Sequence, residues 1–313
     1  MAAGGGTKAI LAALFANAGI AVSKFVGFLI TGSSSMLAES VHSVADTTNQ
    51  GLLLLGQKTS LRKATREHPF GFGRDRYFYS FIVALMLFSL GAVFAIYEGI
   101  HKLQHPEELT SPMVAVVILV LAIALETYSF RTAIVESRKV KGDASWWQFI
   151  RQSRTPELPV VLLEDAGALF GLFFALFGVG LAVITGDAAW DAVGTLMIGV
   201  LLGIIAIILI IEMKSLLIGE GATPREFDLI DEAVVGGRVQ RLIHMRTQYM
   251  GPDELLVAAK IALEPGLPLA EVAAEINAAE DRIRSTVPAA RLIYLEPDLD
   301  RSTAEAAPDS IAP

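Results

Sequence analysis

The chain has 313 residues, of which 53% are hydrophobic and 19% charged, and its mean hydropathy is +0.53. Soluble domains carry about 25% charged residues, so insertion into a membrane is the natural explanation. The absence of cysteine excludes disulfides, thiolate metal sites and cysteine nucleophiles, and the net charge of −8 argues against a nucleic-acid partner, which would need a basic patch.

Six apolar segments are long enough to span a bilayer, which takes about 20 residues each. They cover residues 8–31, 35–57, 77–103, 112–132, 157–184 and 189–217. The loop between the second and third segments and the loop between the fourth and fifth are rich in Lys and Arg, whereas the opposite loops hold few basic residues apart from Lys102. The basic loops and both termini are therefore predicted to be cytoplasmic.

The second segment carries three ionisable residues, Glu39, His42 and Asp46. On a helix they share one face, because positions three and four apart are neighbours. Ionisable groups inside a membrane are costly and belong in a bundle interior or a water-filled cavity. An imidazole and a carboxylate one turn apart are also suited to bind a metal ion. The alternative is a buried structural hydrogen bond between neighbouring helices.

The fifth segment begins with two adjacent carboxylates, Glu164 and Asp165, and the fourth contains Glu126. Successive residues on a helix point about 100° apart, so one of the pair is expected to face the same site and the other the loop; the alternative places both at the membrane surface, where they cap the helix N-terminus. Glu126 is either a proton relay or a packing partner. If the second and fifth segments touch, a set of nitrogen and oxygen ligands forms that suits Zn²⁺ and also accepts Mn²⁺, Fe²⁺ or Co²⁺. The candidate ligands are Glu39, His42, Asp46, Glu164 and Asp165. Ligands bind metal when deprotonated, so competition between metal and protons provides a basis for antiport.

After Lys214 the pattern changes. Thr223-Pro-Arg-Glu226 is a capping box with proline at the first helical position, and it predicts a helix through Val235. Strands are predicted over 239–248, 254–263 and 291–296, with a helix that starts near Leu269 before the last strand. The expected organisation is a membrane domain over 1–218, an α+β domain over 219–298 and a disordered tail over 299–313.

Two stretches resemble the signatures of one family, the cation diffusion facilitators. The first is Ser34-Ser-Met-Leu-Ala-Glu-Ser-Val-His-Ser-Val-Ala-Asp46. The second is His68-Pro-Phe-Gly-Phe-Gly-Arg-Asp-Arg-Tyr77, followed by a span that ends Ile96-Tyr-Glu-Gly-Ile-His101. Together with Val161-Leu-Leu-Glu-Asp165, they resemble the branch that includes zinc transporter nine of animals. The resemblance covers roughly residues 8–297.

The resemblance implies six transmembrane helices and a ferredoxin-like cytoplasmic domain that dimerises. It implies a homodimeric antiporter that exports Zn²⁺ or a similar ion from the cytoplasm in exchange for protons, by alternating access. His42 and Asp46 fall on the second-helix ligands of the family, and Asp165 falls on the fifth-helix aspartate. The family's other fifth-helix ligand, often His, falls on Val161, which is a departure.

Glu164, one turn from Val161, or Glu39 would replace the missing ligand. Other metal sites of the family are eroded: in the loop after the second helix His68 remains but its partner position is Phe72. In the C-terminal domain the positions that resemble family ligands are mostly Ile243, Lys260 and Tyr294, with Glu296 and the neighbouring His244 remaining.

These departures favour an alternative function, a membrane scaffold or metal sensor that keeps the fold and transports poorly. No motif supports a membrane-embedded metal hydrolase, and no phosphate-binding loop points to ATP as an energy source. The acidic composition and alanine-rich ends favour a bacterial inner membrane as the location.

Overall fold

The computed structural model describes residues 18–106 and 109–298. Residues 8–17 of the first predicted segment and the tail predicted to be disordered, 299–313, lie outside this part of the chain. Contacts divide the chain into two units. The first contains the chain up to Ala64 together with Asp75–Leu217, and the second contains Thr65–Arg74 and the chain from Ile218 onward. Each unit is described by itself.

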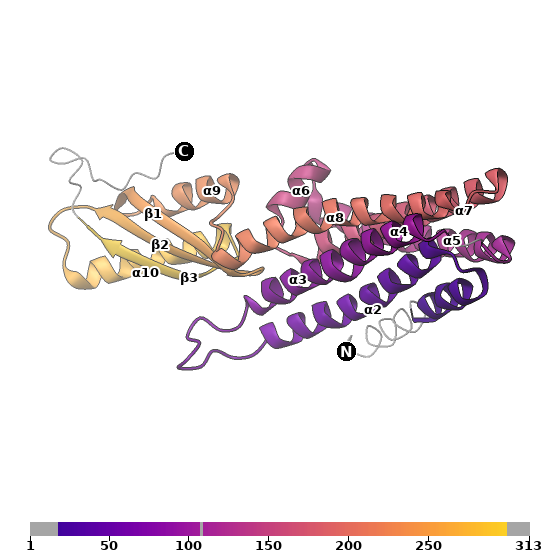
Figure 1. The fold of residues 1–313 in the computed structure, drawn as a ribbon. Helices are drawn as coiled ribbons and strands as arrows, with labels where there is room; N and C mark the ends of the chain where they lie inside the picture. Colours follow the sequence, from indigo (N-terminus) through magenta and orange to yellow (C-terminus); the bar gives the residue numbers. More distant parts are fainter. Residues whose placement is uncertain (1–17, 107–108, 299–313) are drawn as a thin grey trace, which may run out of the picture. The chain divides into compact units, whose positions relative to one another are not determined.

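The first unit is a bundle of helices (Figure 1). Its elements are a helix over Ala18–Thr31, α2 (Ser34–Ser60), α3 (Asp75–Met86), the π-helix η1 (Leu87–Val93), α4 (Phe94–Gln104), α5 (Pro112–Lys141), α6 (Trp146–Gln152), α7 (Glu157–Thr185) and α8 (Ala189–Ile218). The elements α3, η1 and α4 follow one another as a single helix, Asp75–Gln104.

Among the described residues, four helices are long and apolar enough to cross a membrane: Asp75–Gln104, α5, α7 and α8. The helix over Ala18–Thr31 is apolar but described over a shorter length. Helix α2 has 27 residues, and polar side chains such as Glu39, His42 and Asp46 lie along it. Its length is sufficient for a span, but these side chains make it less apolar than the four.

The start of α2 is tied to the start of α8 by a buried carboxylate. Ser33, the residue before the helix, accepts a hydrogen bond from the backbone N–H of Met36. Asp191 of α8 accepts hydrogen bonds from the Ser33 hydroxyl at 2.8 Å and from the Ser34 N–H at 2.7 Å. A carboxylate at a helix N-terminus is favourable because it meets unpaired N–H groups and the positive end of the helix dipole. Asp191 therefore fixes the end of α2 opposite the basic loops.

The helices pack through small residues. Helix α5 packs against α7, and α2 packs against α3 and α7. A Cβ atom on Gly178 of α7 would lie 3.1 Å from the Cα atom of Gly194 in α8, so glycine permits the close contact of these helices. Gly199 of α8 lies at a similar contact, because a Cβ atom there would be 2.7 Å from Ile96 of α4.

Two features of the bundle were not predicted. The π-helix η1 interrupts the helix Asp75–Gln104, and such turns widen a helix locally. The short helix α6 lies in the basic loop before α7. Its start is a capping box, in which Ser145 and Gln148 exchange hydrogen bonds with each other's backbone N–H groups. The Ser-x-x-Gln spacing was a signal for this helix in the sequence.

The second unit is an α+β fold with the predicted order of elements. These are α9 (Pro224–Val234), β1 (Val239–Gly251), β2 (Glu254–Leu263), α10 (Leu269–Thr286) and β3 (Ala290–Pro297). The sheet order is β1-β2-β3, with β1 antiparallel and β3 parallel to β2. Helix α10 makes the crossover that parallel strands need. Ile230 of α9 and Ile283 of α10 are buried in the same core as side chains of the sheet.

The segment 65–74 belongs to this second unit, although it lies between α2 and α3 in the chain. Gly73 lies against the end of β1, where an added Cβ would be 2.7 Å from the carbonyl oxygen of Met250. The Arg74 guanidinium lies 3.7 Å from the sulfur of Met250. The loop sequence therefore serves, at least in part, to pack against the C-terminal fold.

Candidate functional site

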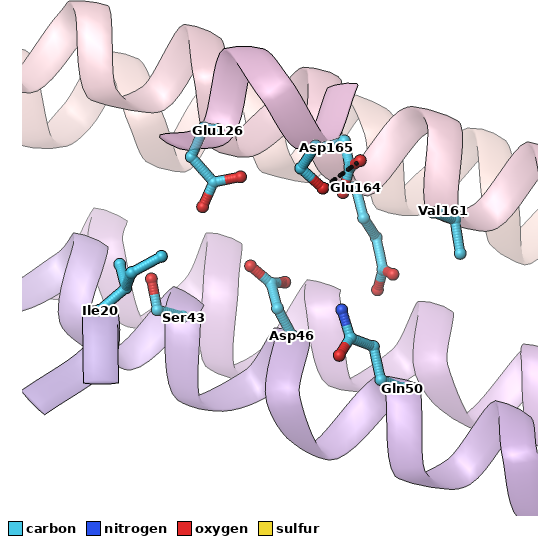
Figure 2. Close-up of a pocket in the computed structure, with 9 residues that line it drawn as sticks. Ile20, Ser43, Asp46, Gln50, Glu126, Val161, Glu164 and Asp165 are labelled. Carbon is cyan, nitrogen blue, oxygen red and sulfur yellow. Dashed lines mark hydrogen bonds between the residues drawn. The ribbon is translucent and has the colours of Figure 1, made fainter. Parts of the chain in front are cut away.

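A cavity between α2, α5 and α7 is lined by carboxylates from all three helices (Figure 2). Asp46 comes from α2, Glu126 from α5, and Glu164 and Asp165 from α7. Asp46 and Glu126 point toward one another across the gap between the ribbons, and Glu164 extends from α7 toward α2. The remaining lining residues are Ile20, Ser43, Gln50, Ser129 and Val161. The second and fifth predicted segments thus meet here with acidic side chains facing one another.

His42 lies beside Asp46 on α2, as the spacing predicted. Its Nε2 atom is 3.6 Å from Oδ2 of Asp46, which is longer than a hydrogen bond. His42 is fully buried, and neither ring nitrogen has a hydrogen-bond partner within the described part of the chain. The Oδ1 atom of Asp46 also lacks a partner there. Buried polar atoms are normally paired, so these donor atoms are positioned to receive a ligand.

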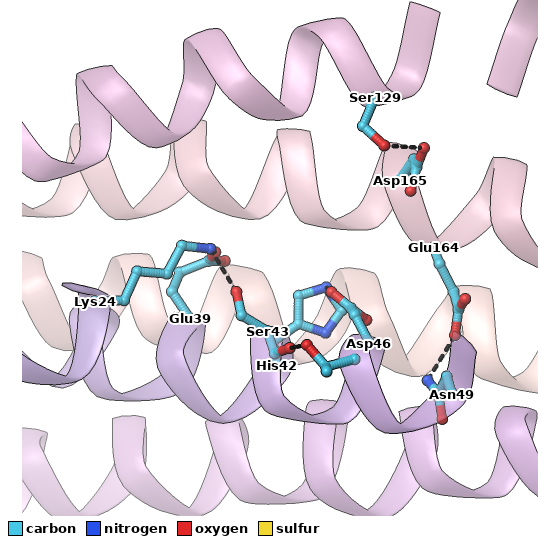
Figure 3. Close-up of polar contacts among 10 residues, drawn as sticks. Lys24, Glu39, His42, Ser43, Asp46, Asn49, Ser129, Glu164 and Asp165 are labelled. Atoms are coloured by element: carbon cyan, nitrogen blue, oxygen red, sulfur yellow. Dashed lines mark hydrogen bonds and ion pairs between the residues drawn. The ribbon is translucent and has the colours of Figure 1, made fainter. Parts of the chain in front are cut away.

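Glu39 is held by a different partner. The ammonium group of Lys24, on the helix Ala18–Thr31, donates to Oε2 of Glu39 at 3.0 Å and to the Ser43 hydroxyl at 2.8 Å (Figure 3). Lys24 and Glu39 are both fully buried. The carboxylate of Glu39 also lies against Gly171 of α7, where any Cβ atom would collide with it. Glu39 does not line the cavity, and an ion pair already balances its charge.

Two side chains orient the acidic pair of α7. The Asn49 amide donates to Oε1 of Glu164 at 2.6 Å, and the Ser129 hydroxyl of α5 donates to Oδ2 of Asp165 at 2.9 Å (Figure 3). Adjacent residues on a helix point in different directions, and here one carboxylate is bonded to α2 and the other to α5. Both nevertheless reach the same cavity.

No three His, Asp or Glu side chains within residues 18–106 and 109–298 lie close enough together to hold a metal ion. The carboxylates line the same cavity, but they are too far apart to coordinate a single ion together. Val161 lines this cavity, one turn before Glu164, so the departure from the family pattern lies at the site itself. A bound cation would have to draw His42, Asp46, Glu164 and Asp165 together.

The positions outside the membrane segments have other partners. His68 lies in the second unit, with its ring 4.7 Å from that of Phe72. The Nε2 atom of His244 accepts a hydrogen bond from Arg246 at 3.2 Å.

Glu296, the other potential donor of the C-terminal domain, lies 3.3 Å from the ammonium group of Lys260, which also donates to Asp298 at 2.8 Å. Hydrogen bonds to Asp298 and Glu296 raise the pKa of Lys260 above its usual value. The ammonium is therefore charged at neutral pH and competes with a metal ion for Glu296.

The sequence analysis missed Lys24, Asn49, Ser129 and Gln50 as neighbours of the candidate ligands. Asn49 and Gln50 continue the spacing of Glu39, His42 and Asp46 along α2, so helical periodicity could have identified them. Ser129 lies one turn after Glu126 on α5. Lys24 had the signal of a lone cation in an apolar segment.

Comparison with known proteins identifies a family for this chain. A model of the cation efflux transmembrane domain matches residues 10–218, more than half of the chain. The mouse proton-coupled zinc antiporter SLC30A9, which is mitochondrial, is 35% identical over 240 residues, 76% of this chain and 42% of its own length.

Two further relatives come from a plant and a bacterium. Metal tolerance protein C4 of Arabidopsis thaliana is 28% identical over 257 residues, 81% of this chain and 56% of its own length. The cation-efflux pump FieF of Cronobacter sakazakii is 27% identical over 293 residues, 92% of this chain and 91% of its own length. This chain spans less than half the length of its animal relative. The domain match and the identity to these relatives confirm the resemblance, and the chain belongs to the cation efflux family of multi-pass membrane transporters.

Proposed function

We propose that this chain is a proton-coupled antiporter that exports Zn²⁺, or a similar divalent cation, from the cytoplasm by alternating access. The observation that carries the proposal is the cavity in which Asp46, Glu126, Glu164 and Asp165 face one another. Beside it lies His42, whose ring nitrogens have no hydrogen-bond partner among the residues that the structure describes. In the proposed architecture six helices span the bilayer, α2 among them, with both termini in the cytoplasm. The relatives named as zinc antiporter and cation-efflux pump support the choice of substrate.

His42, Asp46, Glu164 and Asp165 are the proposed cation ligands. Imidazole nitrogen and carboxylate oxygen are donors for Zn²⁺, and they also accept Mn²⁺, Fe²⁺ or Co²⁺. Each ligand must lose its proton before it binds the cation. A proton on the imidazole of His42 or on the carboxylate of Asp46 therefore excludes the cation from that atom, and release of the cation allows the proton to return.

Glu39 is a less favourable ligand, because a cation would first have to displace Lys24. Glu164 replaces the ligand missing at Val161, since both residues line the same cavity. The C-terminal unit is proposed as a dimerisation domain over 219–298 without a binuclear zinc site, because Arg246 and Lys260 contact the remaining donors. A bacterial inner membrane is the proposed location.

Purified protein in proteoliposomes tests the proposal. With a pH gradient imposed, uptake of Zn²⁺, Mn²⁺, Fe²⁺ and Co²⁺ is compared between the unaltered chain, Asp46→Ala and Asp165→Ala. Saturable flux of one ion that dissipates the pH gradient and disappears in both variants supports the antiporter. Folded protein that transports none of these ions would contradict the antiporter proposal.

One observation favours a second function, a membrane scaffold or metal sensor that transports poorly. The candidate ligands in the described part of the chain do not form a compact group of three. A sensor would bind a divalent cation stoichiometrically and change conformation without moving the ion across the bilayer. Binding measured in detergent, together with absent flux in proteoliposomes, would identify this case.

A further inference from the structure

A groove runs from the cytoplasmic ends of the helices, as defined by the basic loops, toward the carboxylate cavity. Its walls are the second half of α2 and the starts of α3 and α7. Gln50 and Val161 line both this groove and the carboxylate cavity, so they form a shared wall between the two spaces. Figure 2 shows Val161 on α7 and Gln50 on α2 on the same side of Asp46, with Gln50 opposite Glu164.

An ion pair lies among the residues at the outer part of the groove. Arg76, near the start of α3, donates from Nε to Oε1 of Glu157 at 2.5 Å and from Nη2 to Oε2 at 2.9 Å. Two parallel bonds of this kind are strong and fix both side chains. Their side chains are 14% and 19% exposed, so water screens the pair only in part. Glu157 begins α7, the helix that carries Glu164 and Asp165.

The character of the groove changes along its length. Gln57 and Thr155 accompany the ion pair, Leu53 and Leu158 follow, and Gln50 lies at the inner wall. Arg76 and Glu157 are the charged side chains among the residues that line the groove.

We propose that this groove is the route by which the cation enters the carboxylate cavity, and that Arg76 and Glu157 together set the charge met at its entrance. The inference rests on the proposed function, which identifies the ion that passes along the groove as a divalent cation. When Arg76 and Glu157 are paired, their opposite charges cancel, so the entrance neither attracts nor repels a divalent cation strongly. Alone, Glu157 would attract cations and Arg76 would repel them, because charge in a partly desolvated cleft acts strongly on approaching ions.

If Arg76 and Glu157 set the charge at the entrance, substitutions of the two residues should change cation access in opposite directions, whereas a purely structural role should not. If the pair only holds α3 to α7, loss of either partner loosens the same contact, and both variants change access in the same direction. If the pair sets the entrance charge, Arg76→Gln and Glu157→Gln act in opposite directions on a cation. A comparison of two reagents of opposite charge separates these cases, since a wider opening admits both.

The chain has no cysteine, so a single introduced thiol reports on one position of the full chain. Val161→Cys places this thiol at the shared wall. The variant is reconstituted in oriented vesicles in metal-free buffer and modified with membrane-impermeant thiosulfonate reagents, one cationic and one anionic, added to either side. Leu158→Cys, in the middle of the groove, is the second reporter if Val161→Cys folds poorly. Leu269→Cys, an exposed position on α10, is the control.

Modification from the side of the basic loops is expected, with both reagents. Arg76→Gln should raise the ratio of cationic to anionic modification rates by about threefold or more, and Glu157→Gln should lower it by a similar factor. The ratio at Leu269→Cys should not change. These results require no transport, so they can hold even if proteoliposome flux fails and the antiporter proposal is abandoned.

Three results would overturn the inference. One is modification only from the opposite side, and another is an equal ratio, or a shift in the same direction, in both charge variants. The third is reaction with membrane-soluble reagents alone, which would show that the groove opens to lipid.

Discussion

The imidazole of His42 and the carboxylate of Asp46 lie one helical turn apart, with Nε2 and Oδ2 separated by 3.6 Å and no hydrogen bond between them. Both ring nitrogens of His42 and the Oδ1 atom of Asp46 are buried without a partner among the described residues. An unpaired buried polar group costs about 1–3 kcal/mol, so this arrangement is unfavourable unless a ligand or water satisfies it. We infer that these unpaired nitrogen and oxygen atoms belong to a binding site.

Removal of either side chain should therefore weaken cation binding. We expect His42→Gln and Asp46→Asn each to reduce Zn²⁺ affinity by at least about tenfold, because each removes a proposed ligand and outer partners alone contribute about 10–100-fold. Calorimetric titration of the purified protein measures the effect. His68→Gln is the matched control, since His68 lies in the other unit. Equal affinities of Asp46→Asn and the unaltered chain would remove Asp46 from the site.

The buried ion pair of Lys24 and Glu39 gives a prediction about stability. Removal of one partner leaves an uncompensated buried charge, so Lys24→Met alone should destabilise the folded protein by about 3 kcal/mol or more. Lys24→Met combined with Glu39→Gln removes both charges and should recover most of this loss. Thermal unfolding in detergent, followed by size-exclusion chromatography, compares the variants.

A double variant as unstable as Lys24→Met would show that the charge of Glu39 is not the cause. If instead the double variant is stable but loses cation binding, Glu39 belongs to the ligand set after all. Retained binding would confirm that Lys24 keeps this carboxylate out of the set.

Much of this arrangement followed from the sequence, because helical spacing fixes which residues share a face. His42 and Asp46 could be placed together from their separation of four residues. For the acidic start of α7 the spacing left two alternatives, the same site or the membrane surface, and it was the family resemblance that placed Asp165 at the site. The order of elements after residue 219 followed from caps and periodicity. These are local signals, which one stretch of chain carries by itself.

The partners across helices could not be derived in this way. The contact of Lys24 with Glu39, and of Ser129 with Asp165, depends on how helices rotate and pack against each other. The helical spacing predicted that Glu39 shares a face with His42. In the structure, however, the helices pack so that the Glu39 carboxylate contacts Lys24. The π-helix η1 also escaped prediction, since its sequence, Leu87–Val93, contains no helix breaker other than Gly91.

Gly171 illustrates how packing and charge combine. A Cβ atom at this position would collide with Oε1 of Glu39, so Gly171→Ala should displace the carboxylate from its place beside Lys24. We expect a loss of about 1–3 kcal/mol, the usual range for overpacking a core. Gly180→Ala on the same helix is the control, because nothing lies within 4 Å of the added atom.

The same thermal unfolding assay distinguishes the two glycine variants. Gly180→Ala should be neutral or slightly more stable, since alanine favours helix over glycine by up to about 1 kcal/mol. If both variants lose stability equally, the loss reflects helix α7 in general and not the space reserved for Glu39.

Ser129 offers a test of how Asp165 is oriented. Its hydroxyl donates to Oδ2 of Asp165 at 2.9 Å, from the neighbouring helix α5. Partners that orient a ligand contribute about 10–100-fold to metal affinity, so Ser129→Ala should weaken Zn²⁺ binding by at least about tenfold without unfolding the protein. Ser89→Ala is the matched control, because the Ser89 hydroxyl bonds to the carbonyl oxygen of Leu85 and does not line the cavity.

Calorimetric titration of both serine variants at one pH provides the comparison. Ser129→Thr, which keeps the hydroxyl, should restore most of the affinity, whereas a loss caused by packing alone would persist or grow with the larger side chain. An unchanged affinity in Ser129→Ala would mean that Asp165 is held by other contacts or does not bind the cation. In the second case Glu164 would be the ligand from α7, and the proposed set would be reduced to His42, Asp46 and Glu164.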